Sequence, residues 1–158
     1  MILPHRARFI KKYFFEFSFD ENDEIVEPDY EKFKTLNSAE QYFLATIYNW
    51  DDGVEVLEWI VKSEICDKGT AARIFWSAEP DYYFDYTNDT IDEWGKEVFH
   101  LLKAILERFK NQDFVSSKWK FIPLEEGYKV DWPNARGEWE LPLDLKNGVK
   151  GKRPIVIG

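Results

Sequence analysis

Residues 91–110 carry the strongest secondary-structure signal in the chain, because apolar side chains recur there at helical spacing. The repeating positions are Ile91, Trp94, Val98, Leu101, Leu102, Ile105 and Phe109. Thr90 with Glu93 three residues later is a capping-box pair, which predicts that the helix begins at residue 91. A helix with one apolar face is stable in water chiefly when that face packs against other elements. The remaining residues must therefore supply a matching apolar surface.

Three shorter helices are predicted ahead of this one, at about 38–48, 53–62 and 68–77. Ser38 with Gln41 forms a second capping-box pair at the start of the first. The residues expected to face inward are Phe43, Leu44 and Ile47 in the first helix, Val54, Leu57, Ile60 and Val61 in the second, and Ala71, Ala72, Ile74 and Phe75 in the third. A short helix from Asp29 to about Thr35 is predicted to follow an acidic loop over 20–31.

The two ends of the chain have weaker patterns. Alternating Phe15, Phe17 and Phe19 favour a strand over residues 9–19, with a helix over 5–14 followed by a short strand as the alternative. Four prolines break residues 114–158 into short apolar runs typical of strands or extended arms. We predict a mainly α (α+β) fold: a compact bundle of short stacked helices plus one long helix, with a few short strands from the N- and C-terminal segments. Residues 1–158 are expected to form a single domain, with a helical body at about 28–112 and a proline-punctuated segment at 114–158.

The charge of the chain is unevenly distributed. Its formal net charge is −9, yet residues 13–113 hold 9 basic and 24 acidic residues, while residues 1–12 hold four basic residues and no acidic one. Such an acidic body disfavours binding to nucleic acid, which requires a basic face. It makes a basic protein a credible partner.

Several classes of function lack the residues that they require. Cys66 is the only cysteine, so the chain has no internal disulfide and no zinc site built on several thiolates, which favours a cytoplasmic protein. The sequence has no apolar run of about 18 residues that would span a membrane. No P-loop, dinucleotide fingerprint, nucleophile elbow or zinc-protease motif occurs. We therefore expect a non-enzymatic protein without a cofactor or a membrane partner.

The densest acidic motif reads Asn49-Trp50-Asp51-Asp52-Gly53, and another acid, Glu55, follows it closely. Asp51, Asp52 and Glu55 could hold Mg²⁺ or Ca²⁺ through carboxylate oxygens. The interpretation that we favour is structural: Asn49 ends one helix in a left-handed conformation, Gly53 relaxes the turn, and Asp51 or Asp52 caps the next helix. No metal is expected.

A second acidic stretch, residues 79–94, interleaves acids with aromatic rings and contains no basic residue. Rings that supply rigid contact area beside carboxylates that pair with Lys or Arg suit a protein interface. The alternative is a loop whose rings turn inward while its acids face water. The predicted partner-binding residues are Asp81, Tyr82, Tyr83, Asp85, Tyr86, Asp89, Asp92 and Glu93.

A third motif opens the predicted helix at 68–77 and reads Cys66-Asp67-Lys68-Gly69-Thr70-Ala71. The Asp67 carboxylate is expected to accept a hydrogen bond from the amide of Gly69 or Thr70, and Gly69 to allow close packing. Cys66 is expected to be a buried structural thiol. The predicted structural residues of the two motifs are Asn49, Trp50, Asp51, Asp52, Gly53, Cys66, Asp67, Gly69 and Thr70.

Together these two motifs, over residues 38–86, resemble a family of small bacterial proteins described only as a domain of unknown function. Its members share an N-W/Y-D-D-G turn followed by a C-D-x-G-T-A helix start. The chain departs from the family at Ser63-Glu64-Ile65, where many relatives carry His-Pro. The resemblance brings no activity with it, although small acidic proteins of this kind are often immunity proteins that neutralise toxins.

We therefore expect an acidic, immunity-type protein that neutralises a basic toxin domain by direct contact. One alternative is a structural or adaptor module, or a homodimer, in which residues 114–158 dock on another chain. Another is an enzyme that uses carboxylates, with or without a metal.

Overall fold

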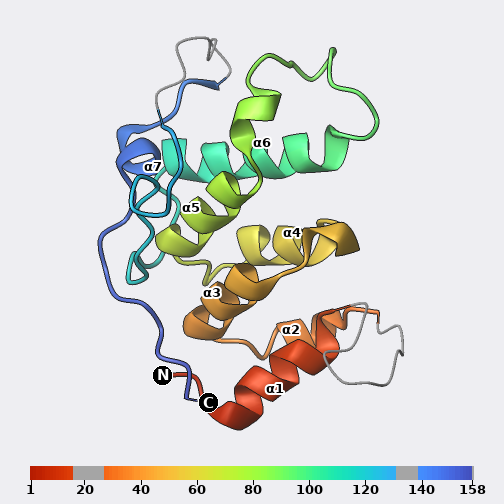
Figure 1. Cartoon of the computed structure of the whole chain (residues 1–158). Coiled ribbons are helices and arrows are strands. Elements are labelled where there is room, and N and C mark those ends of the chain that lie inside the picture. The colour runs from red at the N-terminus through yellow and green to blue at the C-terminus, as the bar shows by residue number, and fades with distance from the viewer. Residues whose placement is uncertain (16–26, 131–138, 158) are drawn as a thin grey trace.

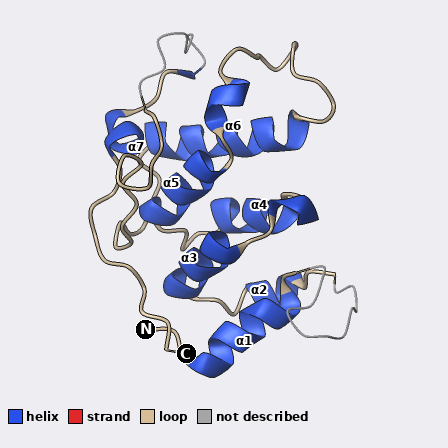
Figure 2. Cartoon of the chain, viewed as in Figure 1, coloured by secondary structure: helices blue, strands red, loops and turns tan. Residues whose placement is uncertain are grey.

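The computed structural model describes residues 1–15, 27–130 and 139–157, and these residues form seven α-helices joined by loops and short 3-10 turns (Figure 2). The elements are α1 (Pro4–Tyr13), α2 (Tyr30–Phe33), α3 (Ser38–Ile47), η1 (Trp50–Asp52), α4 (Glu55–Lys62), α5 (Lys68–Ser77), η2 (Pro80–Tyr83), α6 (Lys96–Lys110) and α7 (Leu143–Asn147). The predicted mainly α fold is confirmed. Strand pairing within the described residues is limited to the isolated bridges Ile2–Val156, Trp119–Lys152 and Phe121–Val149.

The helices stack in layers around a large apolar core, and a second, small apolar cluster holds Ile2, Ala7 and Ala39 (Figure 1). Helix α3 packs against α5, and both α4 and α5 pack against α6. Helices α1 and α2 lie at one end of this stack and α6 at the other (Figure 1). None of the helices in the described part of the chain has the length and apolar character needed to cross a membrane.

Most of the helices predicted from periodicity are confirmed. The four residues predicted to face inward from the second helix are buried, although Val54 precedes α4 as its N-cap residue. Asp29 caps α2 by accepting a hydrogen bond from the Lys32 amide. The predicted capping box of α3 is wrong by one residue, because Asn37 and Glu40 form it and Ser38 lies inside the helix. Of its predicted inward residues, Leu44 is fully buried, whereas Phe43 and Ile47 are half-buried.

Helix α6 starts five residues later than predicted. Gly95 is its N-cap residue, and Thr90 and Glu93 do not form a capping box. The Thr90 hydroxyl instead closes a turn by accepting a hydrogen bond from the Thr87 amide at 2.7 Å. The Asp92 carboxylate accepts a hydrogen bond from the Gly95 amide at 2.8 Å. These local side-chain bonds replace the first helical turn, and Trp94 points into solvent instead of joining the apolar face.

The N-terminal segment is helical where a strand was favoured. Helix α1 spans Pro4–Tyr13, so the strand prediction is wrong there and the alternative of a helix over 5–14 is confirmed. Pro4 at the first helical position has the backbone angle that a helix start needs, and Ala7 and Ile10 face the core. The remainder of the predicted strand, from residue 16, lies outside the described residues, as does most of the predicted acidic loop.

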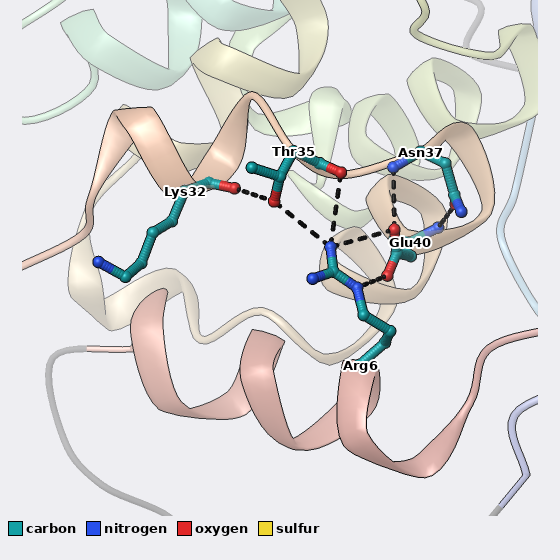
Figure 3. Close-up of polar contacts among 5 residues, drawn as sticks. All are labelled: Arg6, Lys32, Thr35, Asn37 and Glu40. Atoms are coloured by element: carbon teal, nitrogen blue, oxygen red, sulfur yellow. Dashed lines mark hydrogen bonds and ion pairs between the residues drawn. The ribbon is translucent and has the colours of Figure 1, made fainter.

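Helix α1 is fixed to the body by a partly buried ion pair. The Arg6 Nε atom donates to Glu40 Oε2 at 2.5 Å, and Arg6 Nη2 also reaches the Thr35 carbonyl oxygen at 3.5 Å (Figure 3). Glu40 Oε1 accepts a hydrogen bond from the Asn37 amide at 3.0 Å, which completes the capping box (Figure 3). One buried carboxylate therefore holds the start of α3 and joins α1 to it.

The described part of segment 114–158 packs on the helical body. Phe121, Trp139 and Leu145 are buried in the common core. The apolar run predicted as a strand or arm at residues 139–145 instead includes the start of α7. The last residues run along one side of the stack back to the N-terminus, where the Ile2 amide donates to the Ile155 carbonyl oxygen at 2.6 Å (Figure 1).

Candidate functional site

The acidic–aromatic loop, defined here as residues 79–94, connects α5 to α6. It begins with η2 and then arches away from the helical stack before it reaches α6 (Figure 1). Phe84 and Ile91 are buried and anchor it to the core. The buried Trp139 also holds the loop, since its Nε1 atom donates to the Tyr86 carbonyl oxygen at 2.9 Å. The loop is thus held on a fixed base while its outer residues face water.

The rings of this loop divide between core and solvent. Trp94 is 96% exposed and Tyr82 is 54% exposed, whereas Tyr83 and Tyr86 are half-buried. The Tyr82 ring centroid lies 5.0 Å from that of Tyr83 and 5.6 Å from that of Tyr86. The tyrosines therefore form one cluster, and the alternative of a loop whose rings turn inward holds for Phe84 but not for Tyr82 or Trp94.

All the carboxylates of the loop are exposed, and they belong to Glu79, Asp81, Asp85, Asp89, Asp92 and Glu93. Among the described residues, ion pairs reach the loop only through Lys96, whose Nζ lies 2.8 Å from Glu93 Oε1. This contact lowers the pKa of Glu93. A hydrogen bond with Tyr86, followed by the negative charge of Asp92, raises the pKa of Tyr82. Burial, Tyr82 and the carboxylates of Asp92 and Glu79 raise the pKa of Tyr83. The predicted partner-binding residues thus lie on one loop, where their carboxylates are all exposed and Tyr82, Tyr83 and Tyr86 form a cluster of rings.

The Asn49–Gly53 motif forms a tight structural turn. Asn49 has an extended backbone (φ −90°), so the predicted left-handed conformation is wrong, and its side chain caps η1 by accepting from the Asp51 amide. Gly53 has φ +88°, as the turn requires. The predicted capping of the next helix by Asp51 or Asp52 is also wrong, because α4 has no side-chain cap. Trp50 packs against the core from a half-buried position.

No site for a metal ion forms on this motif. Among the described residues, no three His, Cys, Asp or Glu side chains gather closely enough to hold one. The alternative that placed a cation on Asp51, Asp52 and Glu55 therefore has no geometry to support it.

The Cys66–Ala71 motif clamps a distant segment onto α5. The Asp67 carboxylate is fully buried and caps α5 by accepting from the Gly69 amide at 2.8 Å, as predicted. It also accepts from the Ser116 hydroxyl at 2.7 Å and from the amides of Lys118 and Trp119 at 2.7 and 3.2 Å. This carboxylate thereby holds residues 116–119 against the start of α5.

Cys66 is a buried structural thiol, as predicted. It has no exposed surface, and burial, with the nearby Asp67 charge adding to it, raises its pKa to about 12. The positive charge of Arg108 opposes this rise without cancelling it. Cys66 is therefore protonated and unreactive at neutral pH.

One comparison with known proteins found a match. Residues 37–110 match the family model described as a domain of unknown function (DUF4274). The predicted resemblance to such a family is confirmed. The match runs from the N-cap of α3 to the last residue of α6, just under half of the chain, and includes the acidic–aromatic loop. No curated protein and no solved structure gave a significant match.

The structure also contains a cavity of about 550 Å³ between α2, α4 and the turn after α4, which no sequence motif predicts. Its walls include Tyr30, Phe33, Gln41, Trp59 and Ser63. The lining residues come from three separate stretches of chain, 30–36, 41 and 59–65, so no local motif could have revealed the cavity. The unusual burial of Gln41, an uncharged polar residue that is 1% exposed, is visible only in three dimensions.

Proposed function

We propose that this protein is a non-enzymatic binding protein whose acidic–aromatic loop contacts a basic surface of another protein. In its most specific form the partner is a toxin domain that the protein neutralises. The single observation that carries the proposal is Trp94, which is 96% exposed on a loop with six exposed carboxylates.

An indole that is almost fully exposed leaves apolar surface in contact with water, which is unfavourable, and a partner that covers the ring removes this contact. Tryptophan and tyrosine are enriched among the residues that dominate binding energy at interfaces. Trp94 and Tyr82 are large rings already outside the core, and the anchors Phe84 and Ile91 hold the loop in place. Such a pre-ordered surface lowers the entropy that binding must overcome.

The carboxylates determine which kind of protein can bind to the loop. Six negative charges on one loop repel acidic proteins and attract a surface rich in Lys and Arg. They also speed up the first encounter, an effect that salt weakens because the screening length is only about 8 Å at physiological ionic strength.

The test is co-expression with the protein encoded by the adjacent gene, followed by co-purification at low and high salt and an assay of growth. We expect a complex that forms more slowly at high salt, and growth that depends on the present protein. Trp94→Ala should weaken the complex by about tenfold or more, as expected for a central aromatic contact.

A matched pair of variants separates the loop from overall charge. Asp85→Asn with Asp89→Asn removes two exposed charges from the loop, and Asp51→Asn with Glu55→Gln removes two exposed charges elsewhere. Only the first pair should slow association. Equal effects of both pairs, or the lack of any complex and of growth protection, would refute the proposal.

A further inference from the structure

Two segments from opposite ends of the sequence, residues 1–3 and 155–157, pair with each other in a short parallel ribbon. The Ile2 amide donates to the Ile155 carbonyl oxygen at 2.6 Å, and the Ile157 amide donates to the Ile2 carbonyl oxygen at 3.0 Å. We name these two segments the terminal ribbon. It lies beside the start of α1, at the opposite end of the stack from the acidic–aromatic loop (Figure 1).

Burial shows which face of the terminal ribbon points inward. Ile2 is 1% exposed and packs with Ala7 and Ala39 in the small apolar cluster. Successive side chains of an extended segment point to opposite faces, so the neighbours of Ile2 point outward, as do the residues on either side of its bridge partner Val156. The exposed fractions of these outward residues are 71% for Met1, 45% for Leu3, 65% for Ile155 and 38% for Ile157. Val156 is 42% exposed as well, so the ribbon presents five aliphatic side chains to water, four of them on one face.

A group of exposed aliphatic side chains is unfavourable in water and marks a surface that another body covers. The type of side chain favours lipid over protein. Aromatic rings and Arg dominate binding at protein interfaces, where Leu and Val are under-represented. Aliphatic side chains instead suit the boundary between the headgroups and the acyl chains of a bilayer.

The segments that carry the terminal ribbon are basic, in contrast with the rest of the chain. Residues 1–15 and 145–157 hold eight basic residues and no acidic one, whereas the formal net charge of the whole chain is −9. The eight residues are Arg6, Arg8, Lys11, Lys12, Lys146, Lys150, Lys152 and Arg153. A positive region of this kind is complementary to anionic lipids, which attract each nearby Lys or Arg.

Several of these basic side chains are exposed beside the ribbon. Ion pairs with acids of the body engage Arg6 and Arg153. Arg8, in the second turn of α1, and Lys150 and Lys152, just ahead of the ribbon, are exposed. Lys is depleted at protein interfaces, so a rim rich in Lys again favours lipid headgroups.

We propose that the terminal ribbon and its basic flanks bind the surface of an anionic lipid membrane. The aliphatic face enters the boundary between headgroups and acyl chains, and the exposed Arg and Lys side chains contact lipid phosphates. The expectation of no membrane partner rested on the lack of a long apolar run, which binding to a membrane surface does not require. Because the ribbon and the acidic–aromatic loop lie at opposite ends of the stack, this contact is independent of the proposed function (Figure 1).

The test is co-sedimentation of the full chain with two kinds of vesicle, one of phosphatidylcholine alone and one of equal parts phosphatidylcholine and phosphatidylglycerol. We expect the protein to sediment with the anionic vesicles at low salt, to be released from them at high salt, and to stay in solution with the neutral ones.

A pair of apolar substitutions tests the ribbon face. Leu3→Ser with Ile155→Ser removes two exposed aliphatic side chains and should weaken binding to the anionic vesicles about tenfold or more. The control is Val115→Ser with Leu124→Ser, which removes two aliphatic side chains of similar exposure outside the terminal segments and should leave binding unchanged.

A pair of charge substitutions tests the basic flanks. Arg8→Gln with Lys152→Gln should weaken binding about tenfold or more, since each charge near an anionic surface contributes about fivefold. Lys62→Gln with Lys110→Gln removes two exposed charges elsewhere and should have little effect. The charge pair leaves the aliphatic face intact, so it decides the matter if the apolar pair fails to fold.

Trp94→Ala separates the ribbon from the other exposed apolar group, because an indole can also insert into a bilayer. This variant should bind the anionic vesicles as the unmodified protein does. Failure to bind them, equal binding of both kinds of vesicle, or loss of binding in Trp94→Ala would overturn the proposal. Self-association that the apolar pair abolishes, without binding to vesicles, would show that the ribbon is an interface between copies of the chain and would overturn it too.

Discussion

The carbonyl oxygen of Trp119 occupies the space that a side chain on Gly69 would need. A Cβ atom at Gly69 would lie 1.8 Å from that oxygen and 2.7 Å from the carbonyl carbon. Gly69 is therefore required by a backbone 50 residues further along the chain. The close approach depends on Asp67, whose carboxylate draws the amides of Lys118 and Trp119 toward the start of α5.

Gly69→Ala should destabilise the fold severely, because the clash is with backbone and cannot be relieved by a rotamer change. We expect the free energy of unfolding to fall by about 3 kcal/mol or more. Gly127→Ala is the control, since its Cβ meets nothing within 4 Å and only the positive φ of +87° opposes it. Urea denaturation should show that Gly127→Ala lowers the free energy of unfolding by about 1 kcal/mol. Similar losses for both variants would contradict this account.

Asp67→Asn should loosen residues 116–119 from α5. The amide keeps the size of the carboxylate but presents its NH₂ group to donors that need an acceptor, so we expect a loss of about 2–4 kcal/mol. Ser116→Ala removes only one of the donors to Asp67 and should cost about 1 kcal/mol. Urea denaturation measures both, and hydrogen exchange at the Lys118 amide should accelerate more in Asp67→Asn.

Cys66 should resist alkylation in the native protein. Burial raises the pKa of its thiol to about 12, so the thiolate that attacks iodoacetamide is almost absent at pH 8. The unfolded chain in urea should be labelled within minutes, which serves as the control. Rapid native labelling, read by mass spectrometry, would show that this part of the core opens readily.

The contact between Lys68 and Asp144 should make stability depend on acid pH. Burial acts to raise the pKa of Asp144, but hydrogen bonds from Lys68 and Gln112 outweigh it, and the pKa falls below its ordinary value of 3.8. The folded protein therefore gains stability from this group above that pH and loses it as the pH falls further. Asp144→Asn should lower the free energy of unfolding by about 1 kcal/mol at neutral pH. Between about pH 5 and pH 2, the stability of this variant should fall less than that of the unmodified protein. Lys68→Met should have the same signature, and an unchanged pH profile in both variants would argue against the contact.

Truncation to alanine should destabilise the fold strongly at Trp139 and hardly at all at Trp94. Trp139 is 1% exposed and packs against Phe84 and Phe99, so Trp139→Ala should lower the free energy of unfolding by about 3–5 kcal/mol. Trp94 is exposed, and Trp94→Ala should change it by no more than about 0.5 kcal/mol. Thermal unfolding of the two variants decides the matter. A large loss for Trp94→Ala would mean that this ring belongs to the fold and not to an interface.

The sequence predicts this fold best where contacts are local. Helix α4 follows its apolar spacing closely, and the hydrogen bond from the Gly69 amide to Asp67 is foreseeable because the two residues are neighbours. Trp94 shows where apolar spacing fails as a guide. It falls on the helical spacing predicted for residues 91–110, yet it precedes α6 and lies in turns closed by Thr90 and Asp92. Side-chain bonds to nearby backbone compete with the helix and override a periodic pattern.

The two candidate sites differ in the same way, because one is built from neighbouring residues and the other from residues far apart in the sequence. The acidic–aromatic loop is visible in composition because its acids and rings are consecutive. The cavity is not, because Gln41 and Trp59 meet there only after α3 and α4 have packed. The three bonds from residues 116–119 to Asp67 are equally hidden, since nothing near residue 67 announces a partner so far along the chain.

The Asp67 clamp also sets an order of events during synthesis on the ribosome. Three of the four donors to its carboxylate belong to residues 116–119, which are translated after the whole of α6. A nascent chain that ends at Lys110 holds all the helices of the matched region, yet its Asp67 carboxylate has only the Gly69 amide as a donor and lacks the segment 116–119 that packs on it. The contacts that hold residues 116–119 to the start of α5 can therefore form only when translation has passed Trp119.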